Sequence, residues 1–278
     1  MDETTGAFGP DPRPTDELIR TALAQDPEGE EYWETVSLLE YRGTEEVFEA
    51  AARMCNSHID RERLLCAGIM AWVGYTHGAY NEQSVALLIP LLEDKNSEVI
   101  ATAVRSLGKR KAVEAIERIL QLKDHPDEAV REAVATALGD VHYTDIPSGC
   151  LETLAEDLIS LSRDPNRSVR NEATWSLAFW NEATPEVVAA LQDRTKDEDD
   201  EIRADALMGL AQLRYPGVVE LIINELSTRE WIHDDTLDAA AITKDPRLLP
   251  ILQELKEEGF ESTFLDDAIH ACSGNQGA

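Results

Sequence analysis

A fourteen-residue pattern occurs four times in this chain and aligns without gaps, and it restricts the fold more than any other feature of the sequence. The four copies begin at Asn96, Asp127, Asn166 and Asp199 and read NSEVIATAVRSLGK, DEAVREAVATALGD, NRSVRNEATWSLAF and DDEIRADALMGLAQ. Each copy begins with Asn or Asp, which cap helices because the side chain accepts hydrogen bonds from the free N–H groups of the first turn. The pattern therefore predicts four helices with equivalent starts.

Within each copy the apolar residues fall on one helical face. An apolar anchor stands three residues after the start, and a leucine stands eight positions beyond the anchor. Residues at this spacing form a stripe along one side of an α-helix, and such a stripe is typically buried. We therefore expect eight core residues: Val99, Leu107, Val130, Leu138, Val169, Leu177, Ile202 and Leu210. The residue after each leucine is Gly or Ala, which lets a neighbouring helix approach closely.

The spacing between copies indicates how these helices are connected. Successive anchors are 31, 39 and 33 residues apart, the length of one helical hairpin, and further amphipathic stretches lie between them. Helical periodicity continues from Asp16 almost to the C-terminus, and no stretch shows the period-two alternation of a strand. The sequence predicts an all-α solenoid of stacked hairpins, in which each repeat packs on its neighbours.

The shared pattern Asx-x-x-Val-Arg-x-x-Ala-x-x-x-Leu-Gly resembles the second helix of a HEAT repeat, of the bacterial kind described as phycobilisome-lyase-like. The resemblance covers residues 85–225, and the segment from Leu65 to Gly74 fits it more loosely. It implies a right-handed superhelix whose second helices line the concave side. The expected organisation is a disordered tail at 1–14, a solenoid at 15–272 with degenerate repeats at 15–80 and 229–272, and a tail at 273–278.

Charge limits the classes of partner. The chain has 25 Lys and Arg against 55 Asp and Glu, a formal net charge of −30. Nucleic acids and anionic membranes are bound by clustered cations, and the densest basic run here is only Lys109-Arg110-Lys111. We therefore expect neither as a partner. The acidity has two interpretations, attraction to a basic protein or adaptation for solubility and salt, and the sequence leaves both open.

The sequence predicts no enzyme, catalytic residue, cofactor or metal site. HEAT-like deoxyhypusine hydroxylases hold iron with His-Glu pairs, whereas no histidine here is followed by Glu. HEAT-like DNA glycosylases need a basic concave face, which this charge disfavours. The run His233-Asp234-Asp235 offers metal-ligand types, but consecutive side chains of a helix do not converge. Nucleophile-elbow, phosphate-loop and dinucleotide motifs are absent from the sequence.

Cysteines and targeting signals bear on the compartment. Cys55, Cys66, Cys150 and Cys272 show neither paired spacing nor a metal-type cluster. All except Cys150 lie in helical patterns and are expected to be small core residues. There is no apolar run of about 18 residues and no signal-peptide pattern. We expect a cytoplasmic protein that is a monomer when free.

Positions six and ten after each anchor point away from the buried stripe, toward the concave face that the resemblance implies. Anchoring the looser repeat at Leu65 places Tyr75 there as well. The predicted partner-binding residues of this face are Trp175, Phe179, Arg105, Lys109, Asp140, Met208 and Tyr75. Trp175 and Phe179 lie one turn apart, and an exposed aromatic pair in a groove is typical of a binding hot spot. The alternative is that residues 142–147 cover the two rings.

Three of the four anchors are followed by arginine, at Arg131, Arg170 and Arg203. These arginines could form a recognition row. The interpretation that stacked repeats favour is structural, because each guanidinium can pair with an acid or carbonyl of the adjacent repeat.

These observations predict a non-catalytic protein-binding scaffold, an adaptor or an inhibitor of a basic protein partner. A toxin-neutralising immunity protein is one concrete form. The alternative, which the resemblance implies, is a lyase-like enzyme or chaperone that handles a bilin-type chromophore, although no local motif identifies a tetrapyrrole pocket. A self-assembling structural repeat is a third class.

Overall fold

The computed structural model describes residues 11–75, 78–140, 148–180, 183–228 and 231–274, with side chains from residue 153 onward in the third range. Throughout these ranges the regular structure is helical, and no strand occurs in them. The chain divides into two compact units, Met1–Ile146 and Pro147–Ala278. Each unit is a stack of helical hairpins, so the chain is the all-α solenoid that the repeat predicts.

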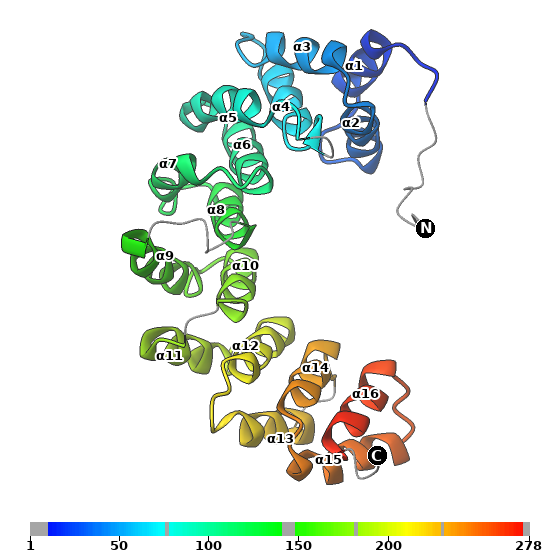
Figure 1. Ribbon diagram of the computed structural model, residues 1–278, viewed down its shortest axis with the longest axis vertical. Helices are drawn as coiled ribbons and strands as arrows, with labels where there is room; N and C mark the ends of the chain where they lie inside the picture. The colour runs from blue at the N-terminus through cyan, green and yellow to red at the C-terminus, as the bar shows by residue number, and fades with distance from the viewer. Residues whose placement is uncertain (1–10, 76–77, 141–147, 181–182, 229–230, 275–278) are drawn as a thin grey trace. The chain divides into compact units, whose positions relative to one another are not determined.

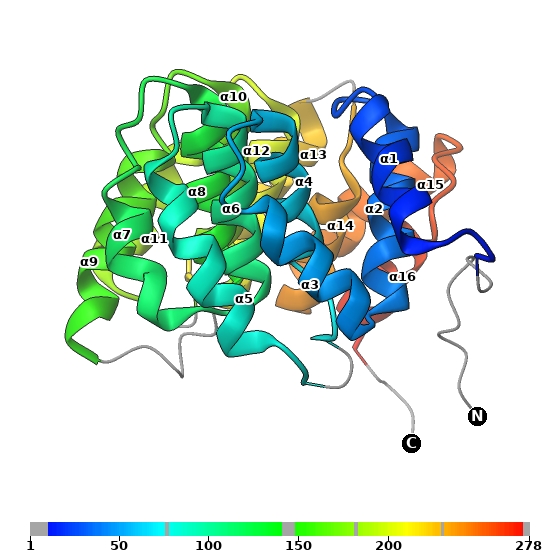
Figure 2. The same cartoon turned by 90° about the horizontal axis from the view of Figure 1, so that it is seen from above.

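The first unit has eight α-helices in its described residues. They are α1 Thr15–Ala24, α2 Glu30–Arg42, α3 Glu45–Met54, α4 Asp60–Ile69, α5 Asn81–Leu88, α6 Ser97–Lys109, α7 Ile116–Leu120 and α8 Glu128–Asp140. The 3-10 turns Ile89–Glu93 and Val113–Ala115 adjoin α5 and α7. Helices α2, α4, α6 and α8 pack in succession. Helices α5 and α7 lie beside α6 and α8 in a second layer of the stack (Figure 1, Figure 2).

The second unit repeats this arrangement. Its helices are α9 Ser148–Leu161, α10 Arg167–Ala178, α11 Pro185–Arg194, α12 Asp200–Gln212, α13 Val218–Thr228, α14 Asp234–Thr243, α15 Leu249–Glu257 and α16 Thr263–Cys272, with a 3-10 turn at Pro246–Leu248. Helices α10, α12, α14 and α16 pack in succession. We call this succession, and α2 to α8 in the first unit, the second-helix row of each unit.

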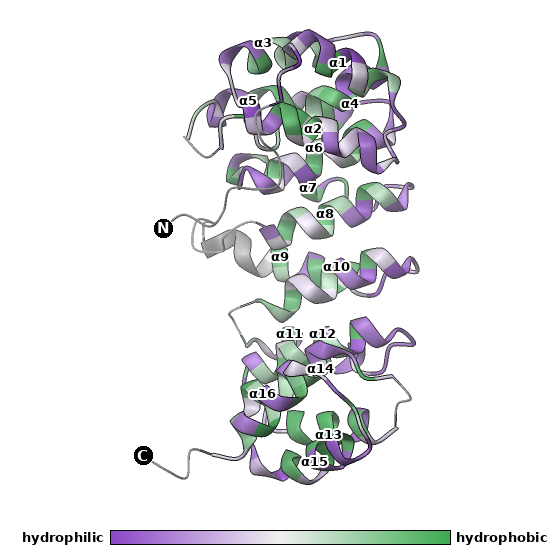
Figure 3. Ribbon diagram, turned by 90° about the vertical axis from the view of Figure 1, so that its right-hand side faces the viewer, coloured by the Kyte–Doolittle hydropathy of each residue, from purple (hydrophilic) through white to green (hydrophobic). Residues whose placement is uncertain are grey.

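The predicted caps begin these helices. The side chain of Asn96 accepts hydrogen bonds from the N–H groups of Glu98 and Val99 at the start of α6, and Asn166 caps α10 in the same way. Asp199 accepts from the N–H of Ile202 at 3.3 Å. Hydrophobic and hydrophilic residues alternate along α8 and α10 (Figure 3), the pattern of helices that bury one side.

All eight predicted core residues are buried, and none is more than 3% exposed. The stripe therefore forms the core as its spacing predicts, because an anchor and a leucine two turns apart lie on the same helical face and meet the same neighbours.

The small residue after the leucine has the predicted packing role at Gly108. A Cβ atom placed there would lie 2.7 Å from Cα of Ala137, on the adjacent helix α8. We expect Gly108→Ala to cost about 1–3 kcal/mol of folding free energy, because α6 and α8 must separate. Gly68 in α4 is the matched control, since its Cβ would find the nearest atom, in Trp33, at 3.5 Å. Gly68→Ala should stabilise the folded protein by about 0.5–1 kcal/mol, because alanine lowers the conformational entropy of the unfolded chain. Urea unfolding of both variants measures the two changes.

The prediction for the cysteines was wrong at two positions. Cys55, at the end of α3, and Cys66, in α4, are buried as expected, but they form a disulfide with their Cα atoms 5.4 Å apart. An eleven-residue separation gave no sign of it, because only the α3–α4 turn brings the two side chains together. Cys272 is a buried free thiol that donates to the carbonyl of Ala240. The side chain of Cys150 lies outside the described residues.

Residues 11–14, at the end of the predicted N-terminal tail, belong to the described structure. Residues 1–10 lie outside the described part of the chain, but Arg42 of α2 donates from its guanidinium to the carbonyls of Asp11 and Arg13. These contacts hold residues 11–13 against the first hairpin.

Candidate partner-binding surface

Trp175 and Phe179 form an exposed aromatic pair at the end of α10. Their side chains are 43% and 40% exposed, and their ring centroids lie 4.5 Å apart in a tilted arrangement. The opposite side of α10 carries its core residues Val169, Ala173 and Leu177. Residues 142–147, the predicted cover, lie outside the described residues. Within the described structure the two rings therefore have the exposure that the hot-spot interpretation needs.

The burial of Met208 contradicts its predicted exposure on the partner-binding face. Met208 occupies the position of α12 equivalent to Trp175, yet only 5% of its surface is exposed. Helix α12 packs between α10 and α14, so a long unbranched side chain there has neighbours on both sides. Met208 therefore contributes to packing in the row, and its side chain lacks the exposure that the prediction assumed.

In the first unit the structure brings Arg105, Lys109 and Asp140 together. Lys109 of α6 forms an ion pair with Asp140 of α8 at 2.9 Å, and Arg105 lies 3.7 Å from Glu132 of the same helix. The two cations are about 40% exposed. Each therefore bridges adjacent repeats while it still reaches solvent.

Tyr75 meets a residue that the sequence analysis did not select. Its ring packs edge-on against Trp72, with centroids 4.9 Å apart, and the two are 36% and 41% exposed. Trp72 in turn lines a hollow of about 490 Å³ across α2, α4 and α6. The other principal lining residues are Trp33, Glu40, Gly68, Arg105 and Lys109.

Trp72 could have been found in the sequence by aligning Arg63 with the anchor arginines. The guanidinium of Arg63 donates to the carbonyl six residues earlier, at Ser57, as Arg170 does to Asp164 and Arg203 to Asp197. The loose repeat is therefore in register when Arg63 is aligned with those arginines. That register puts Gly68 and Trp72 at positions six and ten, whereas anchoring at Leu65 placed the frame three residues too late.

Burial sets the charge state of Glu40, the acidic residue that lines this hollow. It raises the pKa of Glu40 to about 8, and the positive charge of Arg110 opposes the shift. Arg110 is 3% exposed and donates to the carbonyls of Met70 and Val73. At neutral pH a mostly protonated Glu40 therefore lies beside two indoles and two exposed cations.

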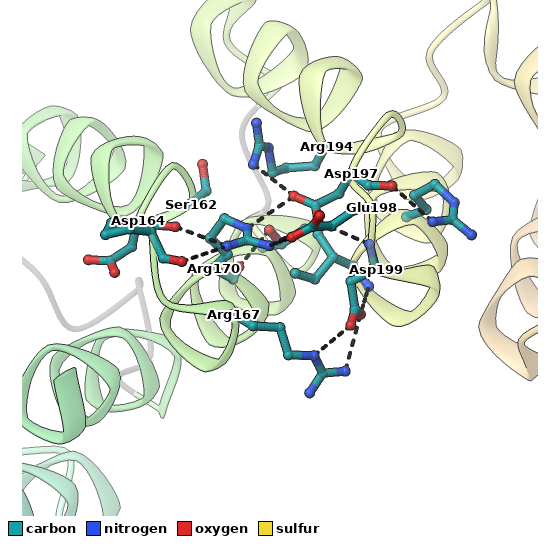
Figure 4. Close-up of polar contacts among 12 residues, drawn as sticks. Ser162, Asp164, Arg167, Arg170, Arg194, Asp197, Glu198 and Asp199 are labelled. Atoms are coloured by element: carbon teal, nitrogen blue, oxygen red, sulfur yellow. Dashed lines mark hydrogen bonds and ion pairs between the residues drawn. The ribbon is translucent and has the colours of Figure 1, made fainter.

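Two of the three anchor arginines, Arg170 and Arg203, have the structural role that stacking favours. Arg170 and Arg203 are 9% and 4% exposed. Figure 4 shows the guanidinium of Arg170 between the turn at Asp164 and the carboxylate of Asp197, which also accepts from Arg194. Arg203 donates to Glu225 at 2.9 Å and to the carbonyl of Asp197. These side chains join consecutive repeats.

No group of three or more His, Cys, Asp or Glu in the described residues is placed to hold a metal ion. None of the helices described is both long and apolar enough to cross a membrane. The chemistry that the surface offers is aromatic, hydrogen-bonding and ionic contact.

The chain is similar to several known proteins. Protein YibA of Escherichia coli strain K12 is 24% identical over 261 residues, which span 91% of this chain and 89% of YibA. The X-ray structure of Escherichia coli YibA superposes with a TM-score of 0.70 at 23% identity, covering 94% of this chain and 92% of that one. The complex of CpcE and CpcF of phycocyanin lyase from Nostoc sp. PCC7120 gives a TM-score of 0.47 at 17% identity, over 59% of this chain and 98% of that one.

The family model of HEAT repeats matches residues 85–178, 118–211 and 155–232, which together cover more than half of the chain. These matches contain all four copies of the capped, anchored helix, and the structure shows those helices stacked as hairpins within each unit. The chain therefore belongs to the HEAT-repeat family.

Proposed function

We propose that this protein is a non-catalytic scaffold that binds another protein, as an adaptor or an inhibitor, and that the partner presents a basic surface. The observation that carries the proposal is the aromatic pair Trp175–Phe179, which stays about 40% exposed on a helix whose other side is fully buried. Large aromatic groups left at the surface of a folded repeat are typical anchors of protein interfaces.

The fold and the charge support the same proposal. HEAT arrays are typically scaffolds, and their extended surfaces suit protein partners. A net charge of −30 favours a partner of opposite sign and raises the rate at which it is encountered. The hollow at Trp33 and Trp72 supplies a further aromatic surface in the first unit.

Truncating Trp175 tests the proposal. The immobilised chain is used to capture proteins from a lysate of its source organism, and the Kd of the tightest binder is then measured. We expect Trp175→Ala to weaken that complex by about 2 kcal/mol or more, because the ring anchors the partner. The melting temperature should hardly change, since the ring contributes little to the core.

Trp231→Ala is the matched control. Trp231 lies in the same unit, is 74% exposed and stands outside the second-helix row, so its loss should leave the affinity unchanged. If Trp175→Ala instead lowers the melting temperature and leaves the affinity unaltered, the ring is a packing residue and the proposal fails.

Salt should affect association more than dissociation. We expect the association rate of the captured partner to fall steeply between low and physiological ionic strength, because screening removes the long-range attraction between opposite charges. Stopped-flow measurement at several salt concentrations gives this slope. A duplex DNA fragment serves as the anionic control and should show no binding at physiological salt. A flat association rate would show that the acidity has no part in recognition.

A further inference from the structure

The hollow at Trp33 and Trp72 lies wholly within the first unit and has the features of a small-molecule site. Its volume is about 490 Å³, within the ~300–1,000 Å³ typical of pockets that hold small ligands. Such pockets combine apolar and aromatic walls with a few polar groups that fix the orientation of the ligand. Here the lining residues come from α2, from α4 and the turn after it, and from α6.

Two indoles form the apolar walls, and each packs against an aromatic neighbour that does not line the hollow. Trp33 lies edge-on to Tyr32, with ring centroids 5.0 Å apart, and Trp72 lies edge-on to Tyr75 at 4.9 Å. Gly68, which also lines the hollow, has no side chain to fill it. The hollow therefore offers aromatic surface that is already held in place, and a flat ring associates favourably with such surface by stacked or edge-on packing.

The ionisable side chains that line the hollow are Glu40, Arg105 and Lys109. The side chains of both cations are about 40% exposed, and the acids beside them lie on α8, outside the lining. Arg105 lies 3.7 Å from Glu132, which is longer than a hydrogen bond, so its N–H groups can donate to another acceptor. The hollow therefore presents two cations in a chain whose net charge is −30, and it favours an anionic group.

Glu40 strengthens this preference because its carboxyl group is mostly protonated at neutral pH. Burial raises its pKa to about 8, and Arg110 is the charged group that opposes the shift. Within the described residues, neither a hydrogen bond nor an ion pair reaches the Glu40 carboxyl group. A protonated carboxyl group carries one O–H donor, and the bond that such a donor makes to a carboxylate is short and strong.

We propose that this hollow binds a small molecule that joins a planar aromatic ring to a carboxylate. The ring packs against the two indoles, and the carboxylate accepts hydrogen bonds from Arg105, Lys109 and the carboxyl group of Glu40. The inference goes beyond the proposed function, because it gives the first unit a ligand of its own. Trp175 belongs to the other unit and takes no part in it.

Isothermal titration calorimetry with the full chain tests the ring and the carboxylate separately. The probes are naphthoate, its neutral amide naphthamide, and decalin carboxylate, which keeps the charge but lacks a flat ring. Naphthoate should bind at least about tenfold more tightly than naphthamide, because only the carboxylate pairs with the cations. It should also bind about threefold or more tightly than decalin carboxylate, because only a flat ring stacks on the indoles.

Arg105→Gln tests the charge of the hollow. The variant should weaken naphthoate by about tenfold and leave naphthamide unchanged, because it removes a positive charge and keeps a hydrogen-bonding side chain. Lys95→Gln is the matched control. Lys95 is a 77% exposed cation of the same unit that pairs with Asp60 outside the hollow, so its loss should leave both affinities unchanged.

Trp72→Ala tests the aromatic wall. It should weaken naphthoate and naphthamide alike by at least about fivefold, because both probes lose the same packing surface. Tyr41→Ala is the control, since Tyr41 is a 64% exposed aromatic residue of α2 that does not line the hollow. Melting temperatures identify any variant that unfolds, and the comparison of probes on the parent chain does not depend on them.

The affinity for naphthoate should also fall as the pH rises through the pKa of Glu40, which is about 8. Between about pH 6.5 and pH 9 the protonated fraction of Glu40 falls from nearly all to about one tenth, and the charged form repels the ligand carboxylate. The Kd should therefore rise about tenfold. Arg110 is the charged group that acts on Glu40, and Arg105 and Lys109 line the same hollow. Glu40→Gln keeps a neutral donor there, so its affinity should be the same at both pH values.

Equal affinity for naphthoate and naphthamide, no binding of naphthoate, or full affinity of Arg105→Gln or Trp72→Ala would each overturn the inference. So would a short glycine peptide ending in a free tryptophan carboxylate that binds more tightly than naphthoate, because the hollow would then belong to the end of a protein chain. These measurements use no protein partner and leave the Trp175 experiment unaffected. Conversely, an unchanged affinity of Trp175→Ala for the captured partner refutes the proposed function even where naphthoate binds.

Discussion

Replacing Arg203 with alanine should lower the free energy of unfolding by about 3–5 kcal/mol, the cost typical of removing one member of a buried ion pair. The Arg203 side chain donates to the carboxylate of Glu225 on α13 and to the carbonyl of Asp197 in the turn before α12. Both side chains of the pair are less than 10% exposed. Without the guanidinium, the Glu225 carboxylate stays in a poorly solvated place and the turn loses a donor.

Arg167→Ala is the control for this measurement. Arg167 also bonds two carboxylates, but its side chain is 51% exposed, so water replaces the lost contacts and the cost should stay below about 1 kcal/mol. Urea unfolding of both variants compares the two. A cost at Arg203 as small as that at Arg167 would show that the arginine does not join the repeats. The double variant Arg203→Met, Glu225→Leu should recover much of the loss, because it removes both charges.

Leu177→Ala should lower the free energy of unfolding by about 2–5 kcal/mol, because it leaves a cavity in the packed stripe. Leu177 is fully buried in α10, eight residues after the anchor Val169. Calorimetry of Leu177→Ala gives the change in melting temperature, and urea unfolding gives the free energy.

Ile242→Ala removes apolar atoms from a residue that is 40% exposed, so its effect should stay below about 1 kcal/mol. Similar losses at Leu177 and Ile242 would contradict the assignment of the stripe as the core. The value at Leu177 also depends on how far α10 can close around the gap.

The fold was predictable because its determinants are local and repeated. A capping Asn or Asp, an anchor three residues on and a leucine eight beyond it specify where a helix begins and which side it buries. Repetition at the length of a hairpin then specifies the stack, because each helix meets a copy of the same neighbour. The exposure of Trp175 and Phe179 followed from the same register.

Where the repeat is degenerate, the sequence was less informative. The hollow at Trp33 and Trp72 escaped notice because the second hairpin lacks an apolar anchor, and only Arg63 keeps the register there. The disulfide between Cys55 and Cys66 depends on the path of one turn, which periodicity does not describe.

By itself the sequence determined helix positions, the buried stripes, the inter-repeat arginines and the acidity of the whole chain. Only the tertiary structure decided which polar and flexible residues the row of helices covers. Asp205 and Met208 both occupy positions that single-helix periodicity leaves open to solvent, yet α10 and α14 close over them from either side. The physical reason is that periodicity describes the faces of a single helix. Exposure depends instead on how closely the neighbouring helices approach, and side chains from three repeats together set that distance.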